Sequence, residues 1–240
     1  MSELHLPMLG DAADAPFPPT ADALLHPNGL LAWGGDLHPK RLLNAYRRGI
    51  FPWYSDDEPI LWWSPAPRCV LLPERVHLSR RTRRRYNSGA FHITADTVFE
   101  QVIKACAAPR KPGEGTWITA AMQEAFLKLH HQGHAHAVEV WKDGQLVGGI
   151  YGLALGRMFF GESMFSRKSD ASKIALIALC RQLVHWDFPL LDCQVPNPHL
   201  KSMGAVVISR DDFETKLAEA VNTPFLAGSW TERFNETARW

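Results

Sequence analysis

An apolar strand, a polar turn and a helix are predicted in succession along Met158-Phe159-Phe160-Gly161-Glu162-Ser163-Met164-Phe165-Ser166-Arg167-Lys168-Ser169-Asp170-Ala171-Ser172-Lys173. We expect a buried strand over 158–160 and a carboxylate, Glu162, at its exit. Ser169, Asp170 and Ser172 are candidate N-caps for the apolar helix that follows. In α/β proteins, catalytic and binding residues often lie where a core strand ends, so Glu162 is a candidate for such a role. The alternative is that Glu162 pairs with an Arg at a surface turn.

The surrounding segments predict a mixed α/β (α+β) sheet. Strands are expected at 69–72, 91–94, 190–195 and 205–208, and the pair Asp143-Gly144 predicts a hairpin between 137–141 and 146–151. Apolar stripes predict helices after Asp96, over 122–129 and after Asp211, with the two aspartates as caps. The loop 111–115 and the tail 224–240 are expected to be coil.

Residues 1–67 are predicted to form a small N-terminal domain, followed by a larger domain over 68–240. A short helix ends at Gly49, and two aromatic clusters interrupted by proline follow it, around Trp53 and around Trp62-Trp63. Such stiff, turn-rich segments do not continue a regular helix.

The composition limits the classes of partner. The 240 residues carry a net charge of +1, so a nucleic acid must be bound by a local patch and not by the charge of the whole chain. The four cysteines lack a CxxC spacing, which favours a reducing compartment. Because the N-terminus does not resemble a signal peptide and no apolar run approaches ~20 residues, we expect a cytoplasmic protein without a membrane contact.

Several motifs resemble those of the leucyl/phenylalanyl-tRNA–protein transferase family. They run in the family's order from Pro27 to Phe213. The motifs are Pro27-Asn28-Gly29-Leu30-Leu31, Gly34-Gly35-Asp36-Leu37, Arg48-Gly49-Ile50-Phe51-Pro52-Trp53, Trp62-Trp63-Ser64-Pro65, Gly115-Thr116-Trp117-Ile118-Thr119, Gly133-His134-Ala135-His136, Gly161-Glu162-Ser163-Met164-Phe165-Ser166 and Asp192-Cys193-Gln194.

The resemblance implies an enzyme that moves Leu or Phe from its tRNA to proteins with an N-terminal Arg or Lys, which marks them for degradation. It also implies a GNAT-like (acetyltransferase) fold for the larger domain, and we expect a monomer. No glycine-rich loop precedes Ala171, so acetyl-CoA is disfavoured and no cofactor is expected. The alternatives are an aminoacyl-tRNA-dependent transferase acting on cell-wall precursors, a silent tRNA-binding module and an ordinary acetyltransferase.

The expected catalytic residues are Asp192, Gln194 and Glu162. Asp192 and Gln194 lie two apart on a strand and therefore share a face. The resemblance implies that Asp192 polarises Gln194, which then assists removal of the amine's proton. Because an amide does not titrate, Gln194 is better suited to orienting the amine or donating to the oxyanion, while Asp192 could orient that amide or accept the proton. Glu162 could contact the terminal nucleotide and the amine, or pair with the acceptor's basic residue. A polar pair satisfied by a neighbouring loop is the structural alternative.

The expected substrate-binding residues are aromatic or flexible. Trp53 and Trp117 suit stacking on the terminal adenine, whereas Trp62 and Trp63 suit the core. Phe159 and Met164, with Phe160 as a further candidate, suit a pocket for the Leu or Phe side chain; plain core packing is the alternative.

A basic run is the candidate surface for tRNA, through its phosphates, or else a solvated face; it comprises Arg80, Arg81, Arg83, Arg84 and Arg85. Four histidines lie close together in the sequence: His130, His131, His134 and His136. They lack Cys or carboxylate partners at ligand spacing, so no metal is expected. Ser163 and Ser166 lack an activating His at a recognisable spacing.

Overall fold

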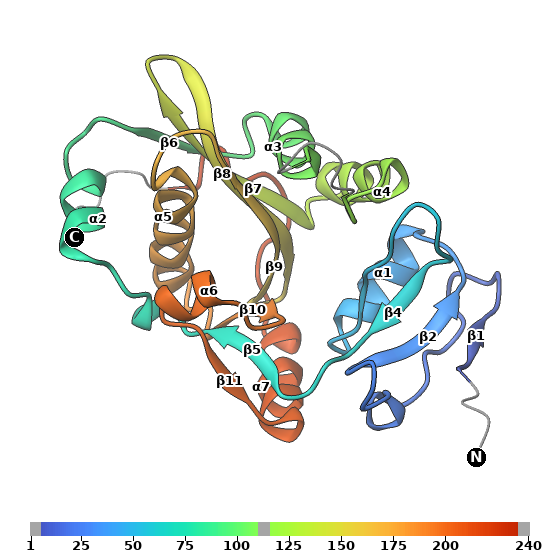
Figure 1. The fold of residues 1–240 in the computed structure, drawn as a ribbon. Coiled ribbons are helices and arrows are strands. Elements are labelled where there is room, and N and C mark those ends of the chain that lie inside the picture. Colours follow the sequence, from blue (N-terminus) through green and yellow to red (C-terminus); the bar gives the residue numbers. More distant parts are fainter. Residues whose placement is uncertain (1–5, 110–115, 235–240) are drawn as a thin grey trace.

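Two sheets organise the chain in a computed structural model that describes residues 6–109 and 116–234 (Figure 1). Within these residues, a small sheet has the strand order β1-β2-β4-β3 and a larger one the order β11-β5-β10-β9-β8-β7-β6. The strands are β1 (Met8–Leu9), β2 (Leu30–Gly34), β3 (Phe51–Pro52), β4 (Leu61–Trp63), β5 (Arg68–Leu71), β6 (His92–Ala95), β7 (Ala135–Lys142), β8 (Gln145–Leu155), β9 (Met158–Ser166), β10 (Leu190–Gln194) and β11 (Val206–Ile208). The β9–β10 pair is parallel and its neighbours are antiparallel, so the predicted mixed sheet is confirmed.

Helices cover both faces of the larger sheet (Figure 1). One face packs on α5, in which the predicted apolar run from Ile174 to Leu179 is buried. The other face packs on α3, α4 and α7, and the predicted inward residues Phe213, Leu217 and Ala220 are buried there. The helices are α1 (Pro39–Tyr46), α2 (Arg80–Tyr86), α3 (Phe99–Ala107), α4 (Ala120–His131), α5 (Ala171–His185), α6 (Pro198–Ser202) and α7 (Arg210–Asn222), with short 3-10 turns at Thr20–Asp22 and Pro73–Arg75.

The small sheet and α1 share a core with the larger sheet. Tyr46 on α1 and Trp62 on β4 belong to the same buried cluster as Phe126 on α4 and Phe160 on β9. The rings of Tyr46 and Phe160 lie 5.2 Å apart. The N-terminal segment is therefore positioned to contribute to a site on the larger sheet. A domain boundary near Pro67 stays a prediction.

The sequence predicted a strand that ends before Gly161. In the structure, β9 continues to Ser166. Pairing with β8 joins Gly152 to Gly161 and Tyr151 to Ser163, so Glu162 is an extra residue in a β-bulge. The bulge reverses the alternation of side chains: Phe160 packs on the α3–α4 face, whereas Met164 packs on the α5 face. The structure thus places Glu162 within the strand.

Strand β10 is irregular at the same level of the sheet. Its parallel pairing with β9 ends at Asp192 and Phe160. Its pairing with β5 shifts between Asp192 and Gln194, and Gln194 has a left-handed backbone with φ of 62°. Because both strands are irregular just beyond their last pair, the sheet opens there. Glu162 and Gln194 lie at this opening.

Two predicted caps, Asp96 and Asp211, are wrong, and a third, Asp170, occupies its predicted position without capping the backbone. Glu139 on β7 accepts hydrogen bonds from the backbone of Thr97 and Val98 before α3, whereas the Asp96 side chain binds His136. Ser209 caps α7 in place of Asp211. Asp170 occupies the N-cap position of α5, but its carboxylate pairs with Arg85 instead of the helix backbone. The predicted loop 111–115 lies outside the described residues; the tail is irregular from 224 to 234, and its remainder also lies outside them.

Candidate active site

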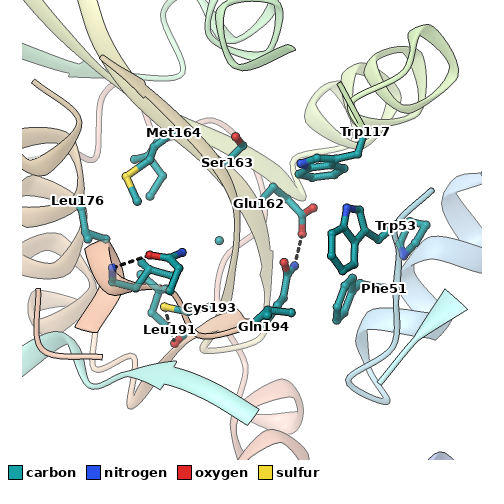
Figure 2. A pocket seen from close by; sticks show the side chains of 16 residues that line it. Phe51, Trp53, Trp117, Glu162, Ser163, Met164, Leu176, Leu191, Cys193 and Gln194 are labelled. Atoms are coloured by element: carbon teal, nitrogen blue, oxygen red, sulfur yellow. Dashed lines mark hydrogen bonds between the residues drawn. The ribbon is translucent and has the colours of Figure 1, made fainter. Parts of the chain in front are cut away.

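A cavity of about 220 Å³ lies between the small sheet, the opening of the larger sheet and α5. Figure 2 shows two indole rings, Trp53 and Trp117, at one end and apolar side chains at the other. Glu162 and Gln194 lie between the two ends. The lining residues are Phe51, Pro52, Trp53, Trp117, Ile150, Gly161, Glu162, Ser163, Met164, Leu176, Leu191, Cys193, Gln194, Val195, Asn197 and Leu200.

Glu162 is held through one of its two carboxylate oxygens. The Tyr46 hydroxyl on α1 donates to Oε1 over 2.7 Å, and the Gln194 amide donates to the same oxygen over 3.0 Å. Among the described residues, no side chain or backbone group hydrogen bonds Oε2. Because Glu162 lines the cavity, Oε2 is the oxygen available to a bound substrate.

The pKa of the Glu162 carboxyl group is raised into the neutral range. Burial raises its pKa to about 8, and the charge of Asp192 adds to the rise. The hydrogen bonds from Tyr46 and Gln194 and the charge of Arg68 oppose it. A carboxylate with such a pKa in a cavity is suited to exchange a proton at neutral pH.

Asp192 is fully buried behind this pair and does not line the cavity. Its two oxygens accept from Arg68 Nε and Nη2 at 2.9 and 2.7 Å. Asp192 Oδ1 also accepts from the backbone N–H of Gln194 at 2.9 Å. The side-chain amide of Gln194 donates to Glu162, so Asp192 contacts the backbone of Gln194 and not its amide.

The predicted indoles are both at the cavity, although 64 residues of sequence separate them. Trp53 is 43% exposed, and its ring lies 5.6 Å from that of Trp63. Trp63 donates its indole N–H to the backbone oxygen of Trp53, and Trp62 is fully buried. Trp53 and Trp117 thus both line the cavity, and Trp62 belongs to the core, as predicted.

The apolar end contains Met164, as predicted, but not Phe159. Phe159 is 1% exposed and packs against Trp230 in the core, and Phe160 is likewise buried. The other apolar lining residues were not predicted, because an apolar residue at a cavity has the same pattern as one in the core; they are Ile150, Leu176, Leu191 and Leu200.

Sequence reasoning also missed Tyr46 and Arg68, which hold the central residues. Tyr46 lies in the apolar stripe of α1, and nothing in that pattern marks its hydroxyl. Arg68 carries a usable signal: it begins a buried strand, and a charge in such a place requires a partner.

The predicted arginines lie on α2, which packs beside α5, and they point in two directions. Arg85 contacts Asp170 at 2.8 Å and Arg81 lies 4.0 Å from the same carboxylate. Arg80, Arg83 and Arg84 are exposed and have no ion pair among the described residues. They are the candidate contacts for a polyanion.

The histidines make contacts that do not require a metal. His136 lies 2.8 Å from Asp96 and stacks on Trp230, and His130 contacts the backbone oxygen of Ala135. In the described residues, no group of three His, Cys, Asp or Glu side chains is placed to bind a metal ion. None of the described helices is both long and apolar enough to pass through a lipid bilayer.

The comparisons with known proteins identify a transferase. A model of the leucyl/phenylalanyl-tRNA protein transferase family matches residues 70–218, and a model of that family's N-terminal domain matches residues 35–66. The chain belongs to the leucyl/phenylalanyl-tRNA–protein transferase family.

Proteins with that name are similar over almost the whole chain. The relative from Thiobacillus denitrificans is 55% identical over 90% of this chain and 94% of its own length. The relative from Xanthomonas axonopodis pv. citri is 56% identical over 97% of this chain and 94% of its own length. Among solved structures, a GCN5-related N-acetyltransferase from Kribbella flavida aligns with a TM-score of 0.37 and 9% identity, over 70% of this chain and 60% of that chain.

Proposed function

We propose that this protein transfers Leu or Phe from its charged tRNA to the N-terminal Arg or Lys of acceptor proteins, which marks them for degradation. The observation that carries the proposal is a cavity with an aromatic end, an apolar end, and Glu162 and Gln194 between them. The terminal adenine stacks at Trp53 and Trp117, and the transferred side chain enters the apolar end. Relatives named leucyl/phenylalanyl-tRNA–protein transferase support this assignment.

The reaction is aminolysis of the aminoacyl ester. The α-amine of the acceptor attacks the ester carbon, an amide bond forms, and the bond to the ribose oxygen breaks. Glu162 Oε2 accepts a proton from the amine and returns one to the departing ribose oxygen. Gln194 donates one N–H to Glu162 and has a second for the oxyanion. An α-amine has a pKa of roughly 7.7–8, so it and Glu162 exchange a proton at little cost.

The apolar end suits aliphatic or aromatic side chains of intermediate size. Met164 is partly buried and flexible, so it can adapt to either Leu or Phe. Leu176 on α5 and Leu191 on β10 lie on rigid elements and limit the shape of this end.

We also propose that the protein acts as a monomer in the cytoplasm. The cavity is lined from a single chain, and all four cysteines are free. Transfer to a cell-wall precursor is the alternative acceptor chemistry, and the family membership favours a protein acceptor.

The deciding assay mixes labelled Phe-tRNA with a peptide that begins with Arg. We expect the peptide to gain one Phe at its N-terminus. The matched control is the same peptide with an acetylated N-terminus, which has no amine to attack. A cell-wall precursor with a free amine forms a third arm. Equal labelling of the Arg-ended and acetylated peptides, or labelling of the precursor alone, would contradict the proposal.

The exposed arginines of α2 are expected to bind tRNA phosphates. Replacing Arg80, Arg83 and Arg84 together by Ala should raise KM for Phe-tRNA and leave kcat nearly unchanged. It should also reduce the slope of log KM against log salt concentration by about 0.9 for each lost phosphate contact. Lys104→Ala is the control, because Lys104 is an exposed cation on α3. A salt slope equal to that of the wild type would exclude this surface.

A further inference from the structure

The buried ion pair behind the cavity joins three parts of the chain. Arg68 is 1% exposed, and its guanidinium carbon lies 5.0 Å from the ring centre of Phe51 and 4.6 Å from that of Phe213. Phe51 belongs to the small sheet and lines the cavity, whereas Phe213 belongs to α7. The guanidinium is therefore fixed between two rings, with its Nε and Nη2 edge facing Asp192.

This pair is poorly explained as a stabilising contact. Removing two charges from water offsets much of their mutual attraction. In addition, Arg68 Nη1 is buried and has no hydrogen-bond partner within the described part of the chain. A packed apolar pair at this place would avoid both costs.

The ion pair instead contacts the backbone of Gln194 through Asp192. Asp192 Oδ1 accepts from Arg68 Nε and from the Gln194 N–H, both at 2.9 Å. Gln194 has a φ of 62°, a conformation that L-residues with a side chain rarely adopt without support. From this conformation the Gln194 amide reaches Glu162 Oε1 at 3.0 Å.

We propose that Arg68 and Asp192 are positioning residues, and that their task is to hold Gln194 in the left-handed conformation from which its amide orients Glu162. This inference rests on the proposed function. The Asp192 carboxylate takes no proton and does not polarise the amide. The carboxylate balances the charge of Arg68, and the rigid fork of Arg68 fixes both oxygens of Asp192.

The inference predicts mutual rescue. Asp192→Asn and Arg68→Gln should each lower kcat by about tenfold or more, because each leaves one buried charge without its partner. The double variant replaces the ion pair by two amides that can hydrogen bond each other. Its Asn oxygen can still accept from the Gln194 N–H, so kcat should return to within about threefold of the wild type.

A second readout separates positioning from general destabilisation. The groups that face Glu162 are Tyr46 on α1, Tyr151 on β8, Asp192 on β10 and Arg68 on β5. The charge of Asp192 raises the pKa of Glu162 and that of Arg68 lowers it. Asp192→Asn should therefore move the pH–rate inflection down, Arg68→Gln should move it up, and the double variant should restore it.

The experiment measures kcat, KM and the pH–rate profile of the four proteins with Phe-tRNA and the Arg-ended peptide, and their Tm values. Transfer by the wild type tests the proposed function, and the ratio of double variant to wild type tests this inference. A double variant with restored Tm but the kcat of Asp192→Asn would overturn it, since the carboxylate would then act in the chemistry. Arg68→Lys keeps the charge without the fork; unchanged kcat in that variant would also overturn it.

Discussion

Replacing Glu162 by Gln is expected to lower kcat for transfer by about 10²–10⁴-fold, the usual contribution of a general base. Gln keeps the size of the side chain, and its oxygen can still accept from Tyr46 and Gln194 as Oε1 does. The group at the Oε2 position becomes an NH₂, which cannot accept the proton of the amine. KM for Phe-tRNA should change little. A variant with wild-type kcat would remove Glu162 from the chemistry.

The pH dependence provides an independent check of the same assignment. A base works when deprotonated, so the wild-type kcat/KM should rise with pH and level off above about 8, the pKa of Glu162. The α-amine of the acceptor titrates in the same range, at roughly 7.7–8. On the acid side, the slope of log kcat/KM against pH should therefore approach about two in the wild type and about one in Glu162→Gln.

As pH rises, the free energy of unfolding of the wild type should fall while its activity increases. The pKa of Glu162 is about 8 in the folded protein, against 4.5 for the unperturbed group. Between these values the folded state binds the extra proton, so the wild type loses stability as pH rises. Glu162→Gln lacks this titration and should be more stable than the wild type at pH 8, by on the order of 1–3 kcal/mol. Urea unfolding at pH 5 and pH 8 measures the difference.

Glu139 offers a matched control for these measurements. It is also buried, and burial raises its pKa to about 7. It lies outside the cavity, where it accepts from Thr94 and from the backbone before α3. Glu139→Gln should alter the dependence of stability on pH and leave the slope of the pH–rate profile as in the wild type.

Local patterns predicted most of the elements. The hairpin of β7 and β8 could be predicted because an Asp-Gly pair favours the positive φ that such a turn requires. In the structure, Asp143 and Gly144 both have a positive φ. Helix α5 could be predicted because the residues from Ile174 to Cys180 form an unbroken apolar run, which is buried on all sides. The two indoles at the cavity were predicted from the family resemblance, and local sequence gives no reason for residues 53 and 117 to meet.

The geometry around Glu162 and Gln194 could not be predicted from local patterns, because it depends on contacts between segments that are distant in the sequence. The sequence Gly161-Glu162-Ser163 has the polarity of a strand end, yet β9 continues because β8 continues to pair with it. The hydroxyl that holds Glu162 comes from Tyr46, 116 residues earlier in the chain. Likewise, Gln194 was expected to take its partner from its own strand and takes it from β9.

Replacing Trp117 by Ala is expected to raise KM for Phe-tRNA by about 5- to 150-fold, the equivalent of the roughly 1–3 kcal/mol that one base–aromatic stack contributes. Trp117 comes from the segment before α4 and Trp53 from the segment after β3, so the two rings are held by different parts of the fold. Trp53→Ala should have an effect of the same kind. The kcat at saturating tRNA should fall much less, because in the described residues Glu162 Oε1 is held by Tyr46 and Gln194 and not by an indole N–H.

Two further substitutions at residue 117 distinguish stacking from the filling of space. Trp117→Phe keeps an aromatic face and should retain most of the affinity, whereas Trp117→Leu keeps apolar volume without a π-face and should behave like Trp117→Ala. Equal KM values for the Phe and Leu variants would mean that Trp117 only closes the cavity. The comparison is made at this end of the cavity because Trp53 and Trp117 both line it, whereas the fully buried Trp62 does not.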